Sequence, residues 1–316
     1  MKKRIITALI LATILIPAVI VPELKTVFEC IVILCLICGS VELLNMFDKK
    51  GKIPLGMKIC SIVLTLLMYF AIVDSYRKMF PGVGDTLVCR FIDKTPYDID
   101  LYMVLIAVFI IITFCMLVIK SFNTREAFEC FAQILYMSIT FGAFTILRSY
   151  GVRFIVYVLI VTTSTDIFAL VFGLKFGKHK MAPTISPKKT WEGAIGGTCI
   201  AMIIGFTFLY LYHYISPYFH GGAVIEFFDG VAAKSYVYDS FNIIIVMILS
   251  TFFMSVCSQI GDLVASNLKR TYGIKDYSDI FPGHGGVLDR FDSTLFSSAT
   301  FVAIIQLIAI SFPLIG

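Results

Sequence analysis

The chain has 316 residues, of which 59% are hydrophobic and only 15% are charged, and its mean hydropathy is +0.92. Soluble globular domains have a lower apolar share and a charged share near one quarter. The composition therefore excludes an ordinary soluble enzyme or soluble binding domain. It predicts an integral membrane protein.

Runs of about 20 apolar residues, the length that crosses a hydrocarbon core of ~30 Å, recur along the whole chain. About nine such runs are present, at residues 5–22, 27–47, 57–73, 101–119, 128–147, 154–173, 193–213, 241–262 and 293–313. The first run follows a basic start and resembles a secretory signal. We expect a retained helix, because no small-residue cleavage pattern follows Pro22 and a second run begins almost at once. The runs predict an all-α, polytopic membrane protein with about nine transmembrane helices.

Polar features are distributed unevenly along the chain. Residues 1–150 are apolar runs with short loops, and we interpret them as an N-terminal transmembrane scaffold. Residues 151–316 carry nearly all the polar motifs, in loops at 174–192 and 266–292, and we interpret them as a catalytic region. Eight of the nine cysteines fall inside apolar runs, which favours packing over metal or redox chemistry.

Lysines and arginines indicate the orientation, because cytoplasmic loops carry an excess of both. If the N-terminus is cytoplasmic, 18 of the 26 lie on that side. Four cations between residues 75 and 100 then lie on the opposite side, against the bias. This orientation places the loops at 174–192 and 266–292 in the cytoplasm, where nucleotides are found.

Residues 266–292 form a charge-dense island between two apolar runs, and charges so close to the hydrocarbon usually have a function. If the preceding helix continues to about Arg270, then Asp262, Ser266 and Lys269 lie at i, i+4 and i+7 on one face. A carboxylate, a hydroxyl and an ammonium group would then point the same way. This arrangement suits a polyanionic substrate.

Two further carboxylates, Asp289 and Asp292, are three residues apart where the last helix is expected to begin. Acidic faces at neighbouring helix ends suit Mg²⁺, which takes one or two carboxylates and completes its shell with water and phosphate oxygens. Plainer interpretations remain open: Asp292 as a helix cap, each basic residue as a positive-inside anchor, and His284 as a loop residue without a task.

The second polar segment, at residues 173–193, contains Pro183 and Pro187, which block a helix. An interfacial loop with snorkelling lysines explains much of this segment equally well. Upstream, Asp166 lies inside an apolar run among hydroxyl side chains, which suggests a water-filled cavity.

These residues resemble the signature of the phosphatidate cytidylyltransferases, also called CDP-diacylglycerol synthases. The matching positions are Ser266, Leu268, Lys269, Arg270, Lys275, Asp276, Pro282, His284, Gly285, Gly286, Asp289, Arg290 and Asp292. The stretch from Asp166 through ISPKKTWEG is similar to the second recurring segment of the family. One departure is Ala265, where the family favours an acidic residue.

The resemblance implies an enzyme that transfers a cytidylyl group from CTP to phosphatidic acid and releases pyrophosphate. It implies Mg²⁺ held by Asp262, Asp289 and Asp292, with a second cation left open, and catalytic roles for Asp289, Lys269 and His284. Substrate phosphates would contact the following residues: Lys188, Lys189, Ser266, Arg270, Lys275 and Arg290. The expected partners are CTP, phosphatidic acid and membrane lipids, without nucleic acid, and whether the chain forms a homodimer stays open. The expected location is the cell membrane.

Three other functions are weighed against this one. An ion or solute transporter would also place carboxylates in the membrane, but it would not need a loop dense in both acids and bases. A CDP-alcohol phosphatidyltransferase requires DGxxAR followed by GxxxDxxxD, which the sequence lacks. A CTP-dependent polyprenyl alcohol kinase is the nearest chemical alternative, and it would transfer the γ-phosphate.

Overall fold

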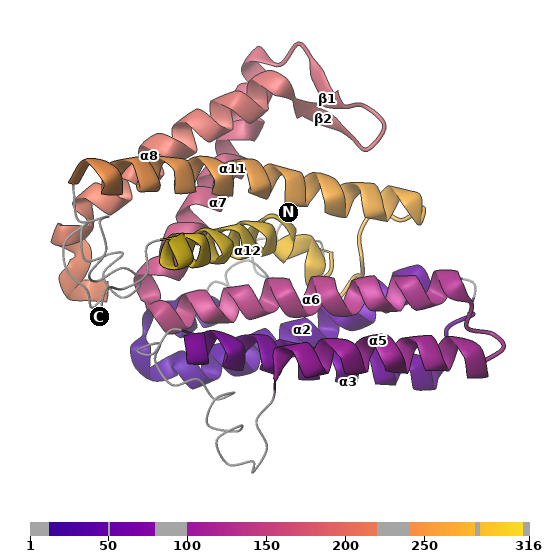
Figure 1. Ribbon diagram of the computed structural model, residues 1–316. Coiled ribbons are helices and arrows are strands. Elements are labelled where there is room, and N and C mark those ends of the chain that lie inside the picture. Colours follow the sequence, from indigo (N-terminus) through magenta and orange to yellow (C-terminus); the bar gives the residue numbers. More distant parts are fainter. Residues whose placement is uncertain (1–12, 50, 80–99, 220–239, 282–284, 312–316) are drawn as a thin grey trace. The chain divides into compact units, whose positions relative to one another are not determined.

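The computed structural model describes residues 13–49, 51–79, 100–219, 240–281 and 285–311, and most of these residues are helical (Figure 1). The helical elements are η1 (Pro22–Leu24), α2 (Lys25–Phe47), α3 (Leu55–Met79), α5 (Leu101–Val118), α6 (Thr124–Tyr150), α7 (Val152–Phe176), α8 (Trp191–Phe219), α11 (Ser240–Thr271) and α12 (Leu288–Ser311). The predicted all-α class is confirmed.

Eight helices in the described ranges are long and apolar enough to cross a membrane. They correspond to eight of the nine predicted runs. The remaining run, at residues 5–22, is described only from residue 13, and its residues 13–20 are helical. Most of the loop at 75–100 lies outside the described residues. Helix α12 begins at Leu288, five residues before the predicted run, because its first turns are polar and a search for apolar residues misses them.

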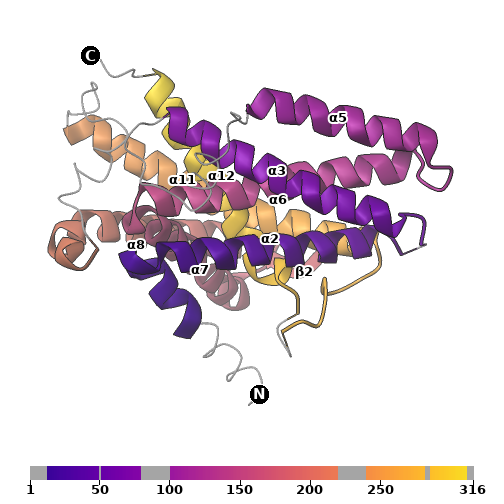
Figure 2. The same ribbon diagram turned by 90° about the horizontal axis from the view of Figure 1, so that it is seen from below.

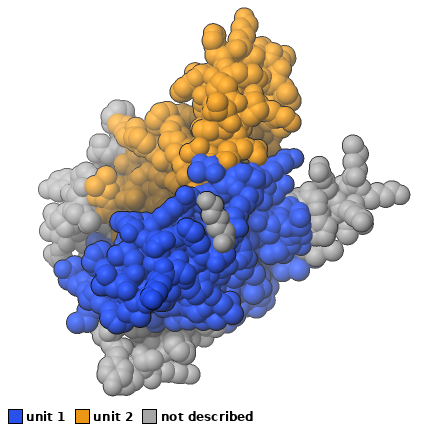
Figure 3. Space-filling view, turned by 90° about the vertical axis from the view of Figure 1, so that its right-hand side faces the viewer, with its two compact units in different colours: residues 1–146, 271–290 blue, residues 147–270, 291–316 orange. Residues whose placement is uncertain are grey.

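The chain packs into two compact units, which Figure 3 shows in blue and orange. Unit 1 contains residues 1–146 and 271–290, and unit 2 contains residues 147–270 and 291–316. The polar segment after α11 therefore packs with the N-terminal helices. The predicted division at residue 150 into scaffold and catalytic region is functional, and packing alone does not test it.

In unit 1, helix α3 packs against both α2 and α5 (Figure 2). Buried polar side chains connect α3 to α6. Tyr69 and Thr145 form a hydroxyl–hydroxyl hydrogen bond of 2.8 Å, and Gln133 Nε2 donates to Thr65 Oγ1 over 3.0 Å. Hydrogen bonds of this kind help helices associate where apolar packing alone gives no preference over lipid.

In unit 2, helices α7 and α8 approach closely at small residues. A Cβ atom on Gly193 would lie 2.6 Å from the carbonyl oxygen of Ala169, and a Cβ atom on Gly197 would lie 2.8 Å from the backbone nitrogen of Ala169. Glycines four residues apart on one helix face allow this close backbone contact between membrane helices. The contact fixes the start of α8 against the end of α7.

A two-stranded antiparallel hairpin, β1 (Lys180–Ala182) and β2 (Ser186–Thr190), connects α7 to α8. The sequence predicted only a loop here. Pro183 and Pro187 do prevent a helix, but a two-stranded hairpin consists of edge strands, where proline is tolerated. Figure 1 shows the hairpin at the end of α8 that begins with Trp191. It carries Lys188 and Lys189 on β2.

Candidate functional site

Asp262 lies on α11, and each of its two carboxylate oxygens contacts another side chain. Its Oδ1 accepts a hydrogen bond from Ser266 Oγ over 3.3 Å, which confirms that these two side chains share a helix face. Its Oδ2 lies 2.7 Å from Lys189 Nζ. The same ammonium group donates to the carbonyl oxygen of Gln259 over 3.3 Å. Lys189 thus ties the hairpin to the part of α11 that carries Asp262.

Two more carboxylates of unit 2 meet at Ser293 on α12. Asp166 Oδ2 accepts from Ser293 Oγ over 3.0 Å, and Asp292 Oδ1 accepts from Ser293 N over 2.8 Å. The charged groups that act most on Asp292 are Asp262, Lys269 and Asp166. Unit 2 therefore gathers three carboxylates, with Lys189 paired to Asp262 and the buried Lys269 acting on Asp292.

Hydroxyl and amide side chains support this cluster from inside the helix bundle. Thr165 on α7 and Ser255 on α11 are hydrogen-bonded over 2.8 Å. Ser255 Oγ and Gln259 Nε2 both donate to Thr198 Oγ1 on α8, over 3.1 and 2.9 Å. The network therefore joins α7, α8 and α11. Its member Gln259 lies about one turn before Asp262 on α11.

The donor set of this cluster suits a hard divalent cation, but it is incomplete as a cage. Among the described residues, no three His, Cys, Asp or Glu side chains are arranged to hold a metal ion. Magnesium does not require such a cage, because it binds through one or two carboxylates and keeps positions for water and phosphate. Asp262 and Asp292 are carboxylates of the kind that could meet this smaller demand. The predicted set of Asp262, Asp289 and Asp292 stays a prediction.

Asp289 belongs to unit 1 and organises the loop that precedes α12. Its Oδ2 accepts hydrogen bonds from Tyr277 N over 2.8 Å and from Gly286 N over 3.0 Å. Gly285 has a φ of +82°, and a Cβ atom there would lie 2.8 Å from the same oxygen. A left-handed residue this close to a carboxylate must be glycine. The motif glycine at 285 is therefore required by the position of Asp289.

Glu42 on α2 is a second buried carboxylate in unit 1, with 4% of its surface exposed. Its Oε1 accepts from Ser278 Oγ over 2.6 Å and from Val287 N over 2.9 Å, and its Oε2 accepts from Leu288 N over 3.0 Å. Glu42 was not among the predicted site residues, because residues 1–150 were interpreted as scaffold. The signal was present: an acid inside an apolar run, the same argument that singled out Asp166.

The remaining predicted site residues differ in exposure. Lys269 is only 9% exposed, unlike a surface anchor. Four predicted phosphate-binding residues are exposed: Lys188, Arg270, Lys275 and Arg290. His284 lies outside the described residues. The capping interpretation of Asp292 is wrong, because α12 already begins at Leu288 and places Asp292 inside the helix.

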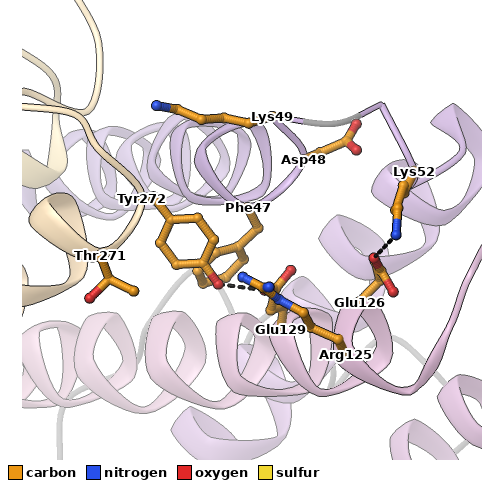
Figure 4. Close-up of a pocket in the computed structure, with 9 residues that line it drawn as sticks. All are labelled: Phe47, Asp48, Lys49, Lys52, Arg125, Glu126, Glu129, Thr271 and Tyr272. Atoms are coloured by element: carbon orange, nitrogen blue, oxygen red, sulfur yellow. Dashed lines mark hydrogen bonds and ion pairs between the residues drawn. The ribbon is translucent and has the colours of Figure 1, made fainter.

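A cavity of about 260 Å³ lies in unit 1, where α2 ends and α6 begins (Figure 4). Its lining residues are Phe47, Asp48, Lys49, Lys52, Arg125, Glu126, Glu129, Thr271 and Tyr272. Arg125 Nε and the Tyr272 hydroxyl both donate to Glu129 Oε1, over 2.8 and 2.5 Å, and Lys52 pairs with Glu126 at 3.6 Å. Burial, and then the bond to Glu129, raises the pKa of Tyr272 above its usual value of 10. These pairs satisfy most charges of the cavity within the protein itself.

Comparison with known proteins gives consistent matches over most of the chain. The model of the cytidylyltransferase family matches residues 2–308. A phosphatidate cytidylyltransferase of Bacillus subtilis strain 168 is 33% identical over 299 residues, which cover 94% of each chain. The Staphylococcus haemolyticus strain JCSC1435 protein of the same name is 36% identical over 200 residues, or 63% of this chain and 66% of that one.

Proposed function

The chain belongs to the cytidylyltransferase family, and we propose that it transfers a cytidylyl group from CTP to phosphatidic acid, giving CDP-diacylglycerol and pyrophosphate. The observation that carries this proposal is the family match over residues 2–308, joined by the similarity of 94% of the chain to a phosphatidate cytidylyltransferase. Eight helices able to cross a membrane suit an enzyme whose substrate and product are both membrane lipids.

The reaction is a phosphoryl transfer between two polyanions. A phosphate oxygen of phosphatidic acid attacks the α-phosphorus of CTP, and a new phosphorus–oxygen bond forms. The bond between the α-phosphorus and the bridging oxygen breaks, and its electron pair leaves with pyrophosphate. Such chemistry needs positioning and charge stabilisation more than covalent catalysis.

The carboxylates and lysines of unit 2 support this chemistry. Asp262 and Asp292 would hold Mg²⁺, which when bound would neutralise phosphate charge, and together with a second cation it would stabilise both the attacking and the leaving oxygens. Lys189 and Lys269 bring ammonium groups to the same carboxylates. We assign both lysines to substrate phosphates, where they would exchange a carboxylate partner for a phosphate oxygen.

Other roles follow from the resemblance and remain proposals. Asp289 is the third proposed ligand of the metal ion, His284 is a further proposed catalytic residue, and a second cation is left open. The additional proposed contacts to substrate phosphates are Ser266, Lys188, Arg270, Lys275 and Arg290.

We also propose that the protein lies in the cell membrane with its N-terminus and both motif loops in the cytoplasm. The excess of lysine and arginine on that side supports this orientation. A cysteine at the exposed position Asp279 should react with an impermeant thiol reagent only from the cytoplasmic side, with the native cysteines replaced. Labelling from outside intact cells would overturn the orientation.

The decisive experiment for the function uses purified protein and CTP labelled at either the α- or the γ-phosphate. With phosphatidic acid, α-label should enter the lipid fraction and γ-label should leave as pyrophosphate. Diacylglycerol should not replace phosphatidic acid, because it lacks the attacking phosphate. Transfer of γ-label to a lipid alcohol would show a CTP-dependent kinase instead.

A further inference from the structure

We propose that Glu42 is a positioning residue for cytidylyl transfer: from α2 it fixes the loop before α12 and the first turn of α12, and through them the carboxylate of Asp289. This role rests on the proposed function. None of the motifs that indicate that function includes Glu42.

The first amide groups of a helix have no partner within the helix and need an acceptor from elsewhere. At the start of α12, the carboxylate of Glu42 accepts from the N–H of Leu288, the first helical residue, and from the N–H of Val287, the residue before it. This acceptor comes from a helix more than 240 residues earlier in the chain. A carboxylate is also favoured here by the positive end of the helix dipole. Glu42 thus caps α12 from outside.

The polar groups that contact the Glu42 carboxylate are all hydrogen-bond donors. Ser278 Oγ, Val287 N and Leu288 N all donate to it, and a backbone N–H cannot accept a proton in return. Charge-assisted hydrogen bonds are shorter and stronger than neutral ones. Three of them converge on one buried carboxylate, so this attachment holds the loop at two points, Ser278 and the start of α12.

The backbone around Glu42 is shaped for this contact. A Cβ atom on Gly286 would lie 2.5 Å from Glu42 Oε1, so only glycine lets the loop approach. One turn earlier on α2, a Cβ atom on Gly39 would lie 3.2 Å from the side chain of Leu288. Both glycines let α2 and the start of α12 come together.

The loop held by Glu42 also supplies the two backbone donors of Asp289. Gly286 N donates to Asp289 Oδ2, while the α-carbon of Gly286 faces the Glu42 carboxylate. Tyr277, the residue before Ser278, donates its N–H to the same Asp289 oxygen. Movement of the loop away from Glu42 would therefore displace both donors of Asp289.

The test compares Glu42→Gln with Glu29→Gln, which removes another buried acid of α2 thirteen residues, or ~20 Å, away. The first readout is hydrogen–deuterium exchange in peptides covering 277–281 and 285–291, which needs no activity. Glu42→Gln should accelerate exchange in both peptides, because the amide cannot accept all three bonds and one of its atoms becomes a donor. Glu29→Gln should leave this exchange unchanged.

The second readout is the rate of cytidylyl transfer. Glu42→Gln should lower kcat about 10–100-fold, as for partners that orient a metal ligand, with little change in KM for CTP. Added to Asp289→Asn, it should cause little further loss, because it acts through that residue. Unchanged exchange, unchanged kcat, or an equal effect of Glu29→Gln would each overturn the proposal.

A variant that removes only one bond covers the case in which Glu42→Gln does not fold. Ser278→Ala should accelerate exchange in the 277–281 peptide and lower kcat about 2–10-fold, the effect of one hydrogen bond. Wild-type values in both readouts would refute the role of Glu42. If the wild-type protein transfers no cytidylyl group, the proposed function fails by itself, whereas the exchange data still show whether Glu42 holds the loop.

Discussion

Replacing Asp292 with asparagine separates a functional carboxylate from a structural one. The substitution keeps the size of the side chain and its Oδ1, which accepts from Ser293 N over 2.8 Å. It removes one negative charge beside Asp262 and Asp166, and Lys269 is the only cation among the groups that act most on Asp292. Two of these three charges are carboxylates, so we expect the change to relieve repulsion on balance.

Opposite effects on stability and activity follow from this arrangement. The free energy of unfolding should change by no more than about 1 kcal/mol, in the stabilising direction, as for other functional groups held at a cost to stability. Activity should fall on the order of 10²-fold, which corresponds to ~2.7 kcal/mol of lost transition-state stabilisation. Replacing a purely structural carboxylate would lower both the free energy of unfolding and the activity.

Both quantities can be measured on the same detergent-solubilised protein. Thermal unfolding gives the stability, and transfer of α-label from CTP to phosphatidic acid gives the rate across a series of Mg²⁺ concentrations. The half-saturating Mg²⁺ concentration should rise in Asp292→Asn. A stable variant with the wild-type rate at limiting Mg²⁺ would refute a ligand role for Asp292.

Two further substitutions test the packing of unit 1. Gly286→Ala places a Cβ atom 2.5 Å from Glu42 Oε1 and should cost about 1–3 kcal/mol and lower kcat, whereas Gly56→Ala, with open space around its Cβ, should be neutral or stabilising. Thermal unfolding and label transfer compare the two, and equal behaviour would contradict the close contact. Tyr272→Phe removes the bond to Glu129 and should cost about 1 kcal/mol without changing kcat. Because the pKa of Tyr272 is raised in the folded state, the difference in stability between the wild-type protein and Tyr272→Phe should be complete below about pH 10. It should decrease as the pH rises above that value.

The helices were predictable from sequence because each needs only a run of apolar residues of the right length. Their polar ends were harder to predict. The shared face of Asp262, Ser266 and Lys269 was predicted on the condition that the helix continues to about Arg270, and α11 does extend to Thr271. The polar start of α12 at Leu288 lies before the apolar run that predicted this helix. The hairpin at 180–190 was missed because two prolines indicate only where a helix cannot form.

Local spacing predicted contacts within one helix, but it could not predict partners from other elements. Asp262 and Ser266 share a face because they are four residues apart, and the structure places their side chains within 3.3 Å. The pairing of Lys189 with Asp262 depends on the hairpin, whose path no spacing rule gives. The same limit explains why Glu42, far from the motif in sequence, was not connected with Asp289.

The motif residues fall into two groups that answer different physical demands. Gly285 and Gly286 are required by steric contact with Asp289 and Glu42, so their identity follows from the backbone of unit 1. Asp262 and Asp292 are placed near each other and near Asp166 in a protein of which only 15% of the residues are charged. Their contacts with Lys189, Ser266 and Ser293 do not by themselves explain three clustered carboxylates, since charged groups close to the hydrocarbon are costly. A residue that stability does not explain, in a chain of this family, is best explained by its substrate.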